Sequence, residues 1–373
     1  GRRRERTEVF AADNLKAAER HARQLRKQWD DEHAAQATYR GTVAELVDEY
    51  AATREHSPTT IERERSILAA IRADLGPQRL NTLTARDLDR WFRELAKPYR
   101  RQYATADGPR VRQVTRSPNT VRHYARVMHA VLQQGYKWDM IASNVADKAS
   151  PPKAVRHDQA EYMPTLAALE AMLATASESL RTAVLLSAST GCRRGEVLAL
   201  RWSDVRDGQL VVSASAYQVA GGVRGVKATK TGVVKVIPLP ASMLDHLAQH
   251  RAWLAAQATT AGVALCDDGP IIANLAADLT GRVAHSPRWY SQEWLRLNLR
   301  HGCTFKLHGL RHLHGSLLTG RGVSLAVAAK RQGHGVAVMA DRYLHSVGAA
   351  DLEAADVIGV ELAALFALPE IAS

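Results

Sequence analysis

Cysteine is scarce in this chain. Cys192, Cys266 and Cys303 are the only three, and no Cys-x-x-Cys pair occurs. An odd number of isolated cysteines excludes a disulfide framework and favours a reducing compartment, so we expect a cytoplasmic protein. The longest apolar runs fall well short of a membrane span, and we expect no membrane partner. Internal repeats and low-complexity tracts are also lacking, which excludes solenoid and fibrous classes.

Basic residues are in excess. The 373 residues carry 50 Lys and Arg against 38 Asp and Glu, for a formal net charge of +12. An excess of this size favours a polyanionic partner, because each phosphate that is neutralised releases counterions. A soluble protein that is merely basic stays open on charge alone. Frequent Ala and Arg, relative to Lys and Ile, are typical of a GC-rich bacterial genome.

Composition and periodicity predict several parts. Residues 1–40 are expected to hold a connector helix with one apolar stripe, and 41–150 a small helical domain. Residues 151–160 begin with two prolines and lack periodicity, which indicates a linker. Residues 161–373 are expected to form a mostly helical domain with a small antiparallel sheet, ending in a short apolar helix at 357–368.

The helical domain contains a basic segment between two predicted helices. Residues 97–117 interleave many arginines with Tyr99 and Tyr103 around an Asp-Gly-Pro turn. We interpret the segment as a loop. Basic and aromatic side chains together can follow a phosphate backbone, and a solvated insertion is an equal alternative.

A polar cluster stands out near the end of the chain. Helical spacing predicts that His308, Arg311 and His312 share one face, while Leu310, Leu313 and Leu317 form an apolar face. Imidazole and guanidinium together suit an anion, because Arg offers a permanently charged fork to phosphate oxygens. His308 and His312 also have the spacing of zinc ligands, but neither an HExxH glutamate nor a third ligand is evident, so we expect no metal.

Other polar residues are ambiguous one by one. Arg193 follows a glycine that is expected to end a helix, and Glu196, one turn on, can orient its guanidinium. Lys230 lies in a Lys-Thr-Gly turn before a strand, where most lysines are simply solvated. His334 follows Gly333, and Tyr343 comes nine residues later, where a lone Tyr would usually belong to a core.

Taken in order, these residues resemble the tyrosine recombinases, the phage integrase family. The family pattern is T-G-x-R-x-x-E, a hairpin Lys, H-x-x-R-H, G-H and then Tyr. This chain fills it with Thr190 to Glu196, Lys230, His308 to His312, Gly333-His334 and Tyr343. The resemblance implies a mainly α fold with a helical core-binding domain and a mostly helical catalytic domain, the DNA breaking-rejoining fold. It also implies that residues 1–40 are the end of an arm-binding domain with its connector helix. Asn144-Val145 departs from the Asn-Pro of many relatives.

The resemblance also implies chemical roles. Tyr343 would attack DNA and form a 3′-phosphotyrosine, while Arg193 and Arg311 would hold the nonbridging oxygens. Lys230 would protonate the leaving oxygen, His308 would act as acid and base, and His334 would bind the phosphate. No cofactor is implied, because the arginines supply the charge that a metal ion supplies elsewhere.

The function implied is site-specific recombination that integrates and excises a phage or mobile element. The partners implied are double-stranded attachment sites, three further copies in a homo-tetramer, and accessory proteins that bend DNA or direct excision. The tail helix would dock in trans on a neighbouring subunit, with docking in cis as its rival. A non-catalytic DNA-binding protein, a metal-dependent nuclease and a type IB topoisomerase are the alternative functions.

Overall fold

The computed structural model describes residues 18–25, 41–54, 57–105, 108–155, 162–222, 224–229, 232–333 and 335–337. The chain divides into two compact units, Gly1–Arg156 and His157–Ser373, and each has its own hydrophobic core. The division falls inside the segment 151–160. Most of the predicted connector at 1–40 and the whole predicted tail helix at 357–368 lie outside the described residues.

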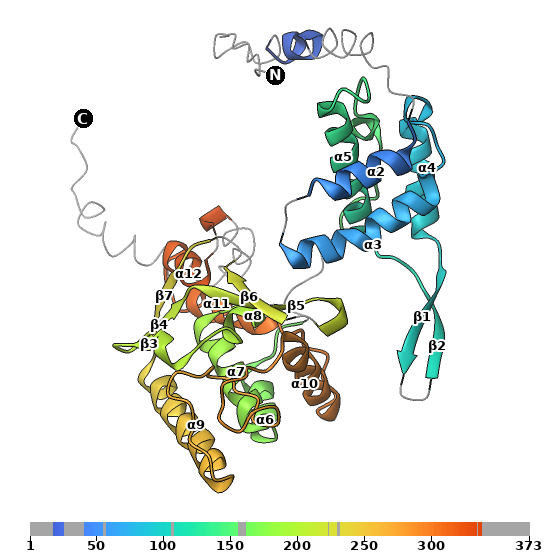
Figure 1. Ribbon diagram of the computed structural model, residues 1–373. Coiled ribbons are helices and arrows are strands. Elements are labelled where there is room, and N and C mark those ends of the chain that lie inside the picture. The colour runs from blue at the N-terminus through green and yellow to red at the C-terminus, as the bar shows by residue number, and fades with distance from the viewer. Residues whose placement is uncertain are drawn as a thin grey trace, which may run out of the picture. The chain divides into compact units, whose positions relative to one another are not determined.

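The described part of the first unit is a bundle of helices with one β-hairpin (Figure 1). Its elements are α2 (Val43–Ala52), α3 (Pro58–Leu75), η1 (Leu80–Thr82), α4 (Ala85–Ala96), β1 (Tyr99–Thr105), β2 (Gly108–Val114), α5 (Pro118–Lys137) and η2 (Val145–Lys148).

Local sequence explains where the helices of the first unit begin. Thr42 and Thr84 start α2 and α4 with capping boxes, in which each threonine hydroxyl and an acidic side chain three residues on satisfy backbone N–H groups. The helices α3 and α5 each begin with a proline in the first turn, after Ser57 and Ser117. Apolar faces of all four helices then meet in one core, which includes Leu46, Ile71, Leu88, Phe92 and Met128.

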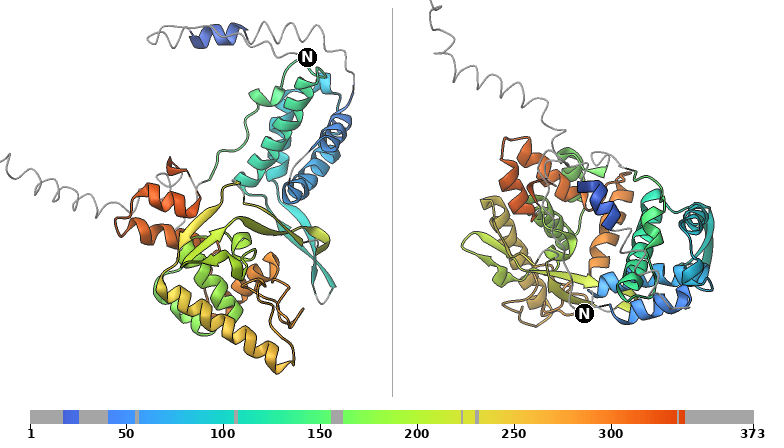
Figure 2. Two further views of the ribbon diagram at one scale, coloured as in Figure 1. Left: turned by 60° about the vertical axis from the view of Figure 1, so that its left-hand side comes forward. Right: turned by 90° about the horizontal axis from the view of Figure 1, so that it is seen from above.

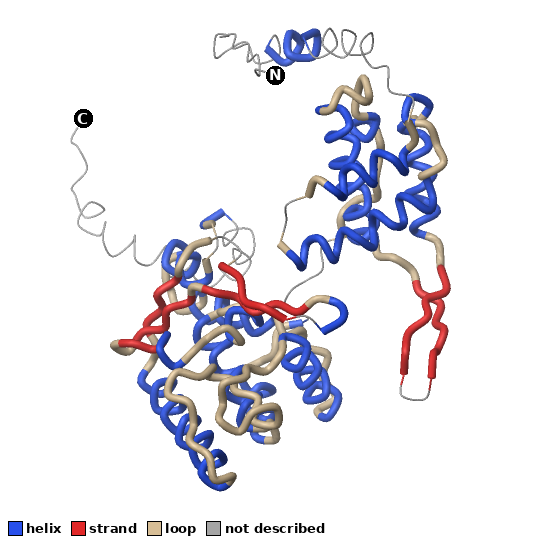
Figure 3. Tube along the Cα trace, in the orientation of Figure 1, coloured by secondary structure: helices blue, strands red, loops and turns tan. Residues whose placement is uncertain are grey.

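The basic segment between α4 and α5 is not a loop. It forms two paired antiparallel strands, β1 and β2, that extend away from the helices (Figure 3). The prediction of a loop was wrong. The two strands are stabilised by pairing with each other and bury neither face, so they lack the apolar alternation that marks a half-buried strand.

In its described residues, the second unit is mostly helical and carries two small antiparallel sheets. Its helices are α6 (Leu166–Ala174), α7 (Glu178–Thr190), α8 (Arg194–Val197), η4 (Trp202–Asp204), η5 (Ala220–Gly222), α9 (Ala241–Thr260), α10 (Pro287–Arg300), α11 (Gly309–Thr319) and α12 (Leu325–Gln332). Its strands are β3 (Val205–Arg206), β4 (Gln209–Val212), β5 (Ala214–Gln218), β6 (Arg224–Ala228) and β7 (Lys235–Pro238). The strands pair in the orders β3-β4-β7 and β5-β6. The fold class expected from the sequence is confirmed, with two small sheets in this unit in place of one.

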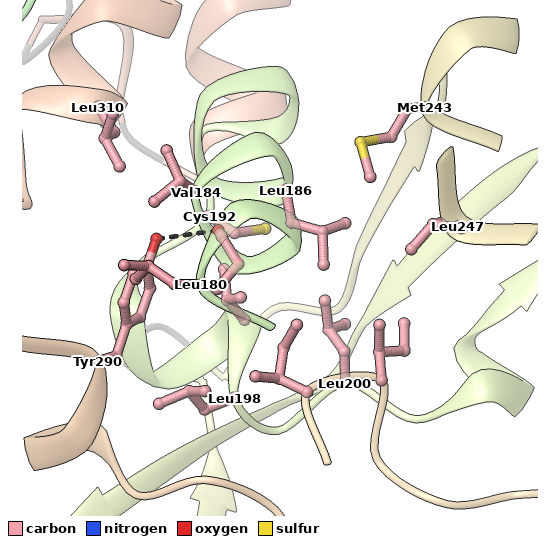
Figure 4. Packing of buried hydrophobic residues seen from close by; sticks show 14 of the residues in the cluster. Leu180, Val184, Leu186, Cys192, Leu198, Leu200, Met243, Leu247, Tyr290 and Leu310 are labelled. Carbon is pink, nitrogen blue, oxygen red and sulfur yellow. Dashed lines mark hydrogen bonds between the residues drawn. The ribbon is translucent and has the colours of Figure 1, made fainter. Parts of the chain in front are cut away.

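Helix α7 is the centre of the second unit. It contacts α8, α9, α10 and α11, and Leu180, Val184 and Leu186 pack among apolar side chains from several of these elements (Figure 4). The Tyr290 hydroxyl of α10 donates a hydrogen bond to the Ala183 carbonyl at 2.9 Å. A rigid α7 matters for the site, because the turn at its C-terminus carries Arg193. Among the described residues, no helix is long and apolar enough to cross a membrane.

Candidate active site

The turn after α7 brings the candidate residues together. Gly191 ends α7 with a φ of 68°, a left-handed conformation that favours glycine. A Cβ at this position would also lie only 2.8 Å from Cδ2 of His314 in α11. The turn is therefore shaped both by its own backbone and by the helix packed against it.

Arg193 leaves this turn at the start of α8 and is held by Glu196. Its backbone N–H donates to Glu196 Oε2 at 2.8 Å, and its Nη1 donates to Oε1 at 3.0 Å. The side chain of Arg193 is 26% exposed, while that of Glu196 is 1% exposed. The buried Glu196 therefore orients Arg193, as the spacing predicted, and part of the Arg193 side chain stays accessible to a ligand.

Lys235 completes a buried charge group that the sequence analysis missed. Its Nζ donates to Glu196 Oε2 at 2.6 Å, and its side chain is only 5% exposed. Burial by itself would raise the pKa of Glu196. The charge and hydrogen bond of Lys235, together with the bonds from Arg193, outweigh burial, so this pKa lies below its ordinary value. A signal was present: the two-residue period of β7 puts Lys235 on the same buried face as Ile237.

Arg311 lies deeper than the sequence predicted. It is 1% exposed, and its two terminal nitrogens donate to the carbonyls of Gly191 and Gln332. Gln332 returns a hydrogen bond from Nε2 to the Arg311 carbonyl at 3.0 Å. Arg311 thus joins three elements: helix α11, the turn after α7 and the C-terminus of α12. The sequence offered no signal for Gln332.

The two histidines of the same motif lie nearer the surface. His308 is exposed at the position before α11, His312 is half-buried, and their rings meet edge to face at 4.8 Å. Leu310 and Leu313 are buried as predicted. The prediction for Leu317 was wrong: it is 40% exposed, because the packed face of α11 runs through Arg311 and His314 instead.

Three predicted residues, Lys230, His334 and Tyr343, lie outside the described residues. The described residues include the sequence neighbours of two of them, Lys230 and His334. Gly232 N donates to the Thr229 carbonyl at 2.9 Å across the turn before β7. Gly333 ends α12 with a φ of 64°, and a Cβ there would lie 3.1 Å from Lys235 Cδ. The backbone that precedes His334 therefore packs against the buried charge group.

Cys192 is a structural residue of the turn. It is 2% exposed, and its Sγ lies 3.8 Å from Lys235 Nζ. Burial raises the pKa of its thiol, and a protonated, enclosed thiol is a poor nucleophile. Across the described ranges, no three His, Cys, Asp or Glu side chains form a group that could hold a metal ion. That the chemistry needs no metal stays a prediction.

Solved structures of two integrases share this fold. The Tn1549 transposon integrase in complex with a circular intermediate DNA superposes with a TM-score of 0.63 at 15% identity, over 81% of this chain and 95% of that one. A lambda integrase tetramer bound to a Holliday junction superposes with a TM-score of 0.58 at 20% identity, over 79% of this chain and 77% of that one. The fold of this chain is therefore the fold of these two integrases.

The sequence identifies the family. Residues 154–349, more than half of the chain, match the phage integrase family. This chain belongs to the phage integrase family, as the motifs predicted. It is also 24% identical to a tyrosine recombinase XerC-like protein of Caldanaerobacter subterraneus subsp. tengcongensis, over 45% of this chain and 46% of that protein. The chain thus spans about half the length of this curated relative.

Proposed function

We propose that the chain is a site-specific DNA recombinase of the tyrosine type, which integrates and excises a phage or mobile element. The observation that carries this proposal is that Arg193 and Arg311 both lie at the turn after α7. Each is held there by a buried hydrogen-bond partner. Arg311 binds the Gly191 carbonyl, two residues before Arg193, and Glu196 orients Arg193. Two anchored guanidiniums suit the charge that develops on a phosphodiester under attack.

The proposed reaction begins with Tyr343. Its phenolate attacks the scissile phosphorus, so that a Tyr–O–P bond forms, the P–O5′ bond breaks and the DNA 3′ end becomes attached to the protein. Arg193 binds one nonbridging oxygen, and Arg311, which is buried and donates to the Gly191 and Gln332 carbonyls, turns outward to bind the other. Because the new phosphodiester retains the energy of the old one, a 5′-hydroxyl of another strand can attack it and restore DNA without ATP.

Proton transfers are assigned to the remaining residues of the motif. Lys230 donates a proton to the leaving 5′-oxygen, which avoids expulsion of an alkoxide. His308 takes the phenol proton as general base and acts as acid in the reverse step, and His334 donates a hydrogen bond to the phosphate. The exposed place of His308 before α11 supports this role, since a general base must reach the ligand.

The assembly proposed is a tetramer on two attachment sites. The lambda integrase of the Holliday junction structure is itself a tetramer on DNA, which supports this assembly. Residues 41–150 would bind the core site, residues 151–160 would link the two domains, and the tail helix at 357–368 would dock in trans. With DNA as its substrate, the protein would act in the bacterial cytoplasm, associated with the nucleoid, where proteins that bend DNA or direct excision would join it.

The test is covalent trapping. Labelled duplex that carries the attachment core, nicked beside the cleavage position, is incubated in EDTA with the wild type, with Tyr343→Phe and with Tyr136→Phe as a matched loss of one hydroxyl. We expect a denaturation-resistant adduct with the wild type and Tyr136→Phe, and none with Tyr343→Phe. DNA binding without any adduct would show a non-catalytic DNA-binding protein, and dependence on a divalent ion would show a nuclease.

Strand exchange separates the proposal from a topoisomerase. In an assay with two attachment duplexes, the proposed enzyme yields recombinant products. Relaxation of a supercoiled plasmid by single-strand cleavage, with no recombinant product, would instead assign type IB topoisomerase activity.

A further inference from the structure

The β1–β2 hairpin is the most exposed regular element of the first unit. Its strands pair in register from Tyr99 opposite Val114 to Thr105 opposite Gly108. Both strands lead away from the helices in two different views (Figures 1 and 2). A hairpin of two strands is marginally stable by itself and buries little apolar surface. The contribution of the hairpin to the stability of the fold therefore does not explain why it extends so far from the helices.

The two faces of the hairpin differ in charge. Because alternate residues of a strand point to opposite faces, Arg101, Arg110 and Arg112 share one face with Tyr99 and Tyr103. We call this set the arginine face. The opposite face carries a single arginine, and its members are Arg100, Gln102, Val111 and Gln113. All the arginines named here are exposed.

One cross-strand pair of the arginine face is unfavourable without a ligand. Arg101 lies directly opposite Arg112, and like charges in this position destabilise a ribbon. Neither arginine forms an ion pair with any residue that the structure describes. Charged residues can protect exposed strands from aggregation, but that purpose would not require three arginines on one face and one on the other.

The base of the hairpin is fixed to the helical core. The guanidinium of Arg116 stacks on the Tyr99 ring at 4.0 Å and lies 5.4 Å from the Tyr124 ring. It also donates a hydrogen bond to the Leu95 carbonyl at 3.2 Å. These contacts hold the first residues of the hairpin in a defined direction. The hairpin therefore loses less conformational entropy when it binds a ligand.

We propose that the β1–β2 hairpin is an additional DNA-binding arm, which contacts duplex DNA through the arginine face. This inference rests on the proposed function, since it takes DNA as the substrate. Arginine forks match phosphate oxygens and guanine edges, and the major groove of B-form DNA admits a two-stranded ribbon. The exposed tyrosine, Tyr103 at 43%, adds a flat ring that can pack on sugars or bases. Binding of a polyanion also removes the repulsion between Arg101 and Arg112.

The experiment measures binding apart from cleavage. Fluorescence anisotropy with a labelled duplex of about 40 base pairs and mixed sequence gives the dissociation constant over a range of salt concentrations. The proteins are the full chain carrying Tyr343→Phe, and the same protein with Arg101→Gln, with Arg112→Gln or with both. Arg100→Gln, on the opposite face of the same strand, is the matched control for net charge.

We expect Arg101→Gln and Arg112→Gln each to weaken binding about fivefold and to reduce the slope of log K against log salt by about 0.9. Arg100→Gln should change binding less than about twofold. Equal effects of Arg100→Gln and Arg101→Gln would overturn the proposal, since only net charge would then matter, and unchanged binding in all variants would overturn it as well.

Adduct formation on the nicked attachment duplex separates this inference from the proposed function. With Tyr343 intact, Arg101→Gln/Arg112→Gln should still form the adduct when protein saturates the DNA. Loss of DNA affinity with a preserved adduct supports the arm. An absent adduct in the wild type refutes the proposed function while the binding measurement still decides the arm.

Discussion

At the scale of single residues, the site depends on charges that are buried behind the surface. Glu196 is shared between Arg193, which is partly exposed, and Lys235, which is enclosed. A buried carboxylate of this kind is favourable only while both cations remain, because removal of one partner leaves uncompensated charge in a poorly solvated place. The orientation of Arg193 is therefore tied to a lysine in β7 that cannot itself reach the solvent.

Arg193 and its neighbour Arg194 offer a matched pair for the proposed chemistry. Arg193→Gln should slow adduct formation at least about a hundredfold, because one stabilising charge on the reacting phosphate is lost. Arg194→Gln should stay within a few-fold of the wild type, since Arg194 is exposed and bonds Ser291. Single-turnover cleavage of the nicked duplex measures both, and a hundredfold loss in Arg194→Gln would contradict the assignment.

Lys235→Met tests the buried charge group through stability. We expect a loss of about 3–5 kcal/mol in the free energy of unfolding, because Glu196 keeps its charge without its closest partner. The double variant Lys235→Met/Glu196→Gln should recover part of this loss. Urea denaturation checks both, with Lys330→Met on the exposed side of α12 as control. A loss below about 1 kcal/mol in Lys235→Met would show that the ion pair contributes little.

His314 should make stability depend on pH. Burial lowers its pKa to about 4, from an ordinary value of 6.5, and its Nδ1 donates to the Ala188 carbonyl. Between these values the unfolded chain binds a proton that the native protein does not, so stability falls as pH falls from about 6.5 towards 4. The loss from this group reaches about 3 kcal/mol.

The comparison of unfolding free energies at pH 7 and pH 5 measures this effect. His314→Asn retains a donor for Ala188 but cannot bind a proton, so it should lose less stability on acidification than the wild type. An unchanged slope in His314→Asn would contradict burial of a neutral His314.

At the scale of elements, the starts of helices follow from local signals in the sequence. The helices α3 and α5 begin at Ser-Pro pairs and α4 begins at the capping residue Thr84, and such signals act within one turn of the helix. The hairpin was missed, since its strands are stabilised by each other and not by burial of one face. The depth of Arg311 was also missed, because it depends on carbonyls 120 and 21 residues away.

Gly191 tests how far the turn depends on its surroundings. Gly191→Ala should cost about 3 kcal/mol, because the new Cβ adds a close contact with His314 to the strain of a left-handed residue. Gly262→Ala has a similar φ of 74° but open space around it, so it should cost only about 1 kcal/mol. Thermal denaturation of the two variants measures the difference in stability that is due to the contact with His314. Equal losses of stability would show that backbone strain alone accounts for the cost.

At the scale of the whole molecule, each of the two units has its own hydrophobic core, so we expect two separate unfolding transitions. Leu88 lies in the core of the first unit and Leu186 in that of the second. Leu88→Ala and Leu186→Ala should each cost about 2–5 kcal/mol and lower only one of two calorimetric transitions. A single transition that shifts in both variants would show that the units unfold together.

The order of chemically meaningful residues was determined by the sequence itself. Arg193, Lys230, His308, Arg311, His334 and Tyr343 occur at family spacing, so membership of the phage integrase family followed without coordinates. Tertiary structure alone decided which charges are buried, which carbonyls hold Arg311, and that Lys235 completes the group around Glu196. The physical reason is distance along the chain: capping and periodicity act over a few residues, whereas a buried ion pair joins residues that only packing brings within 3 Å, as for Lys235 and Glu196 at 2.6 Å.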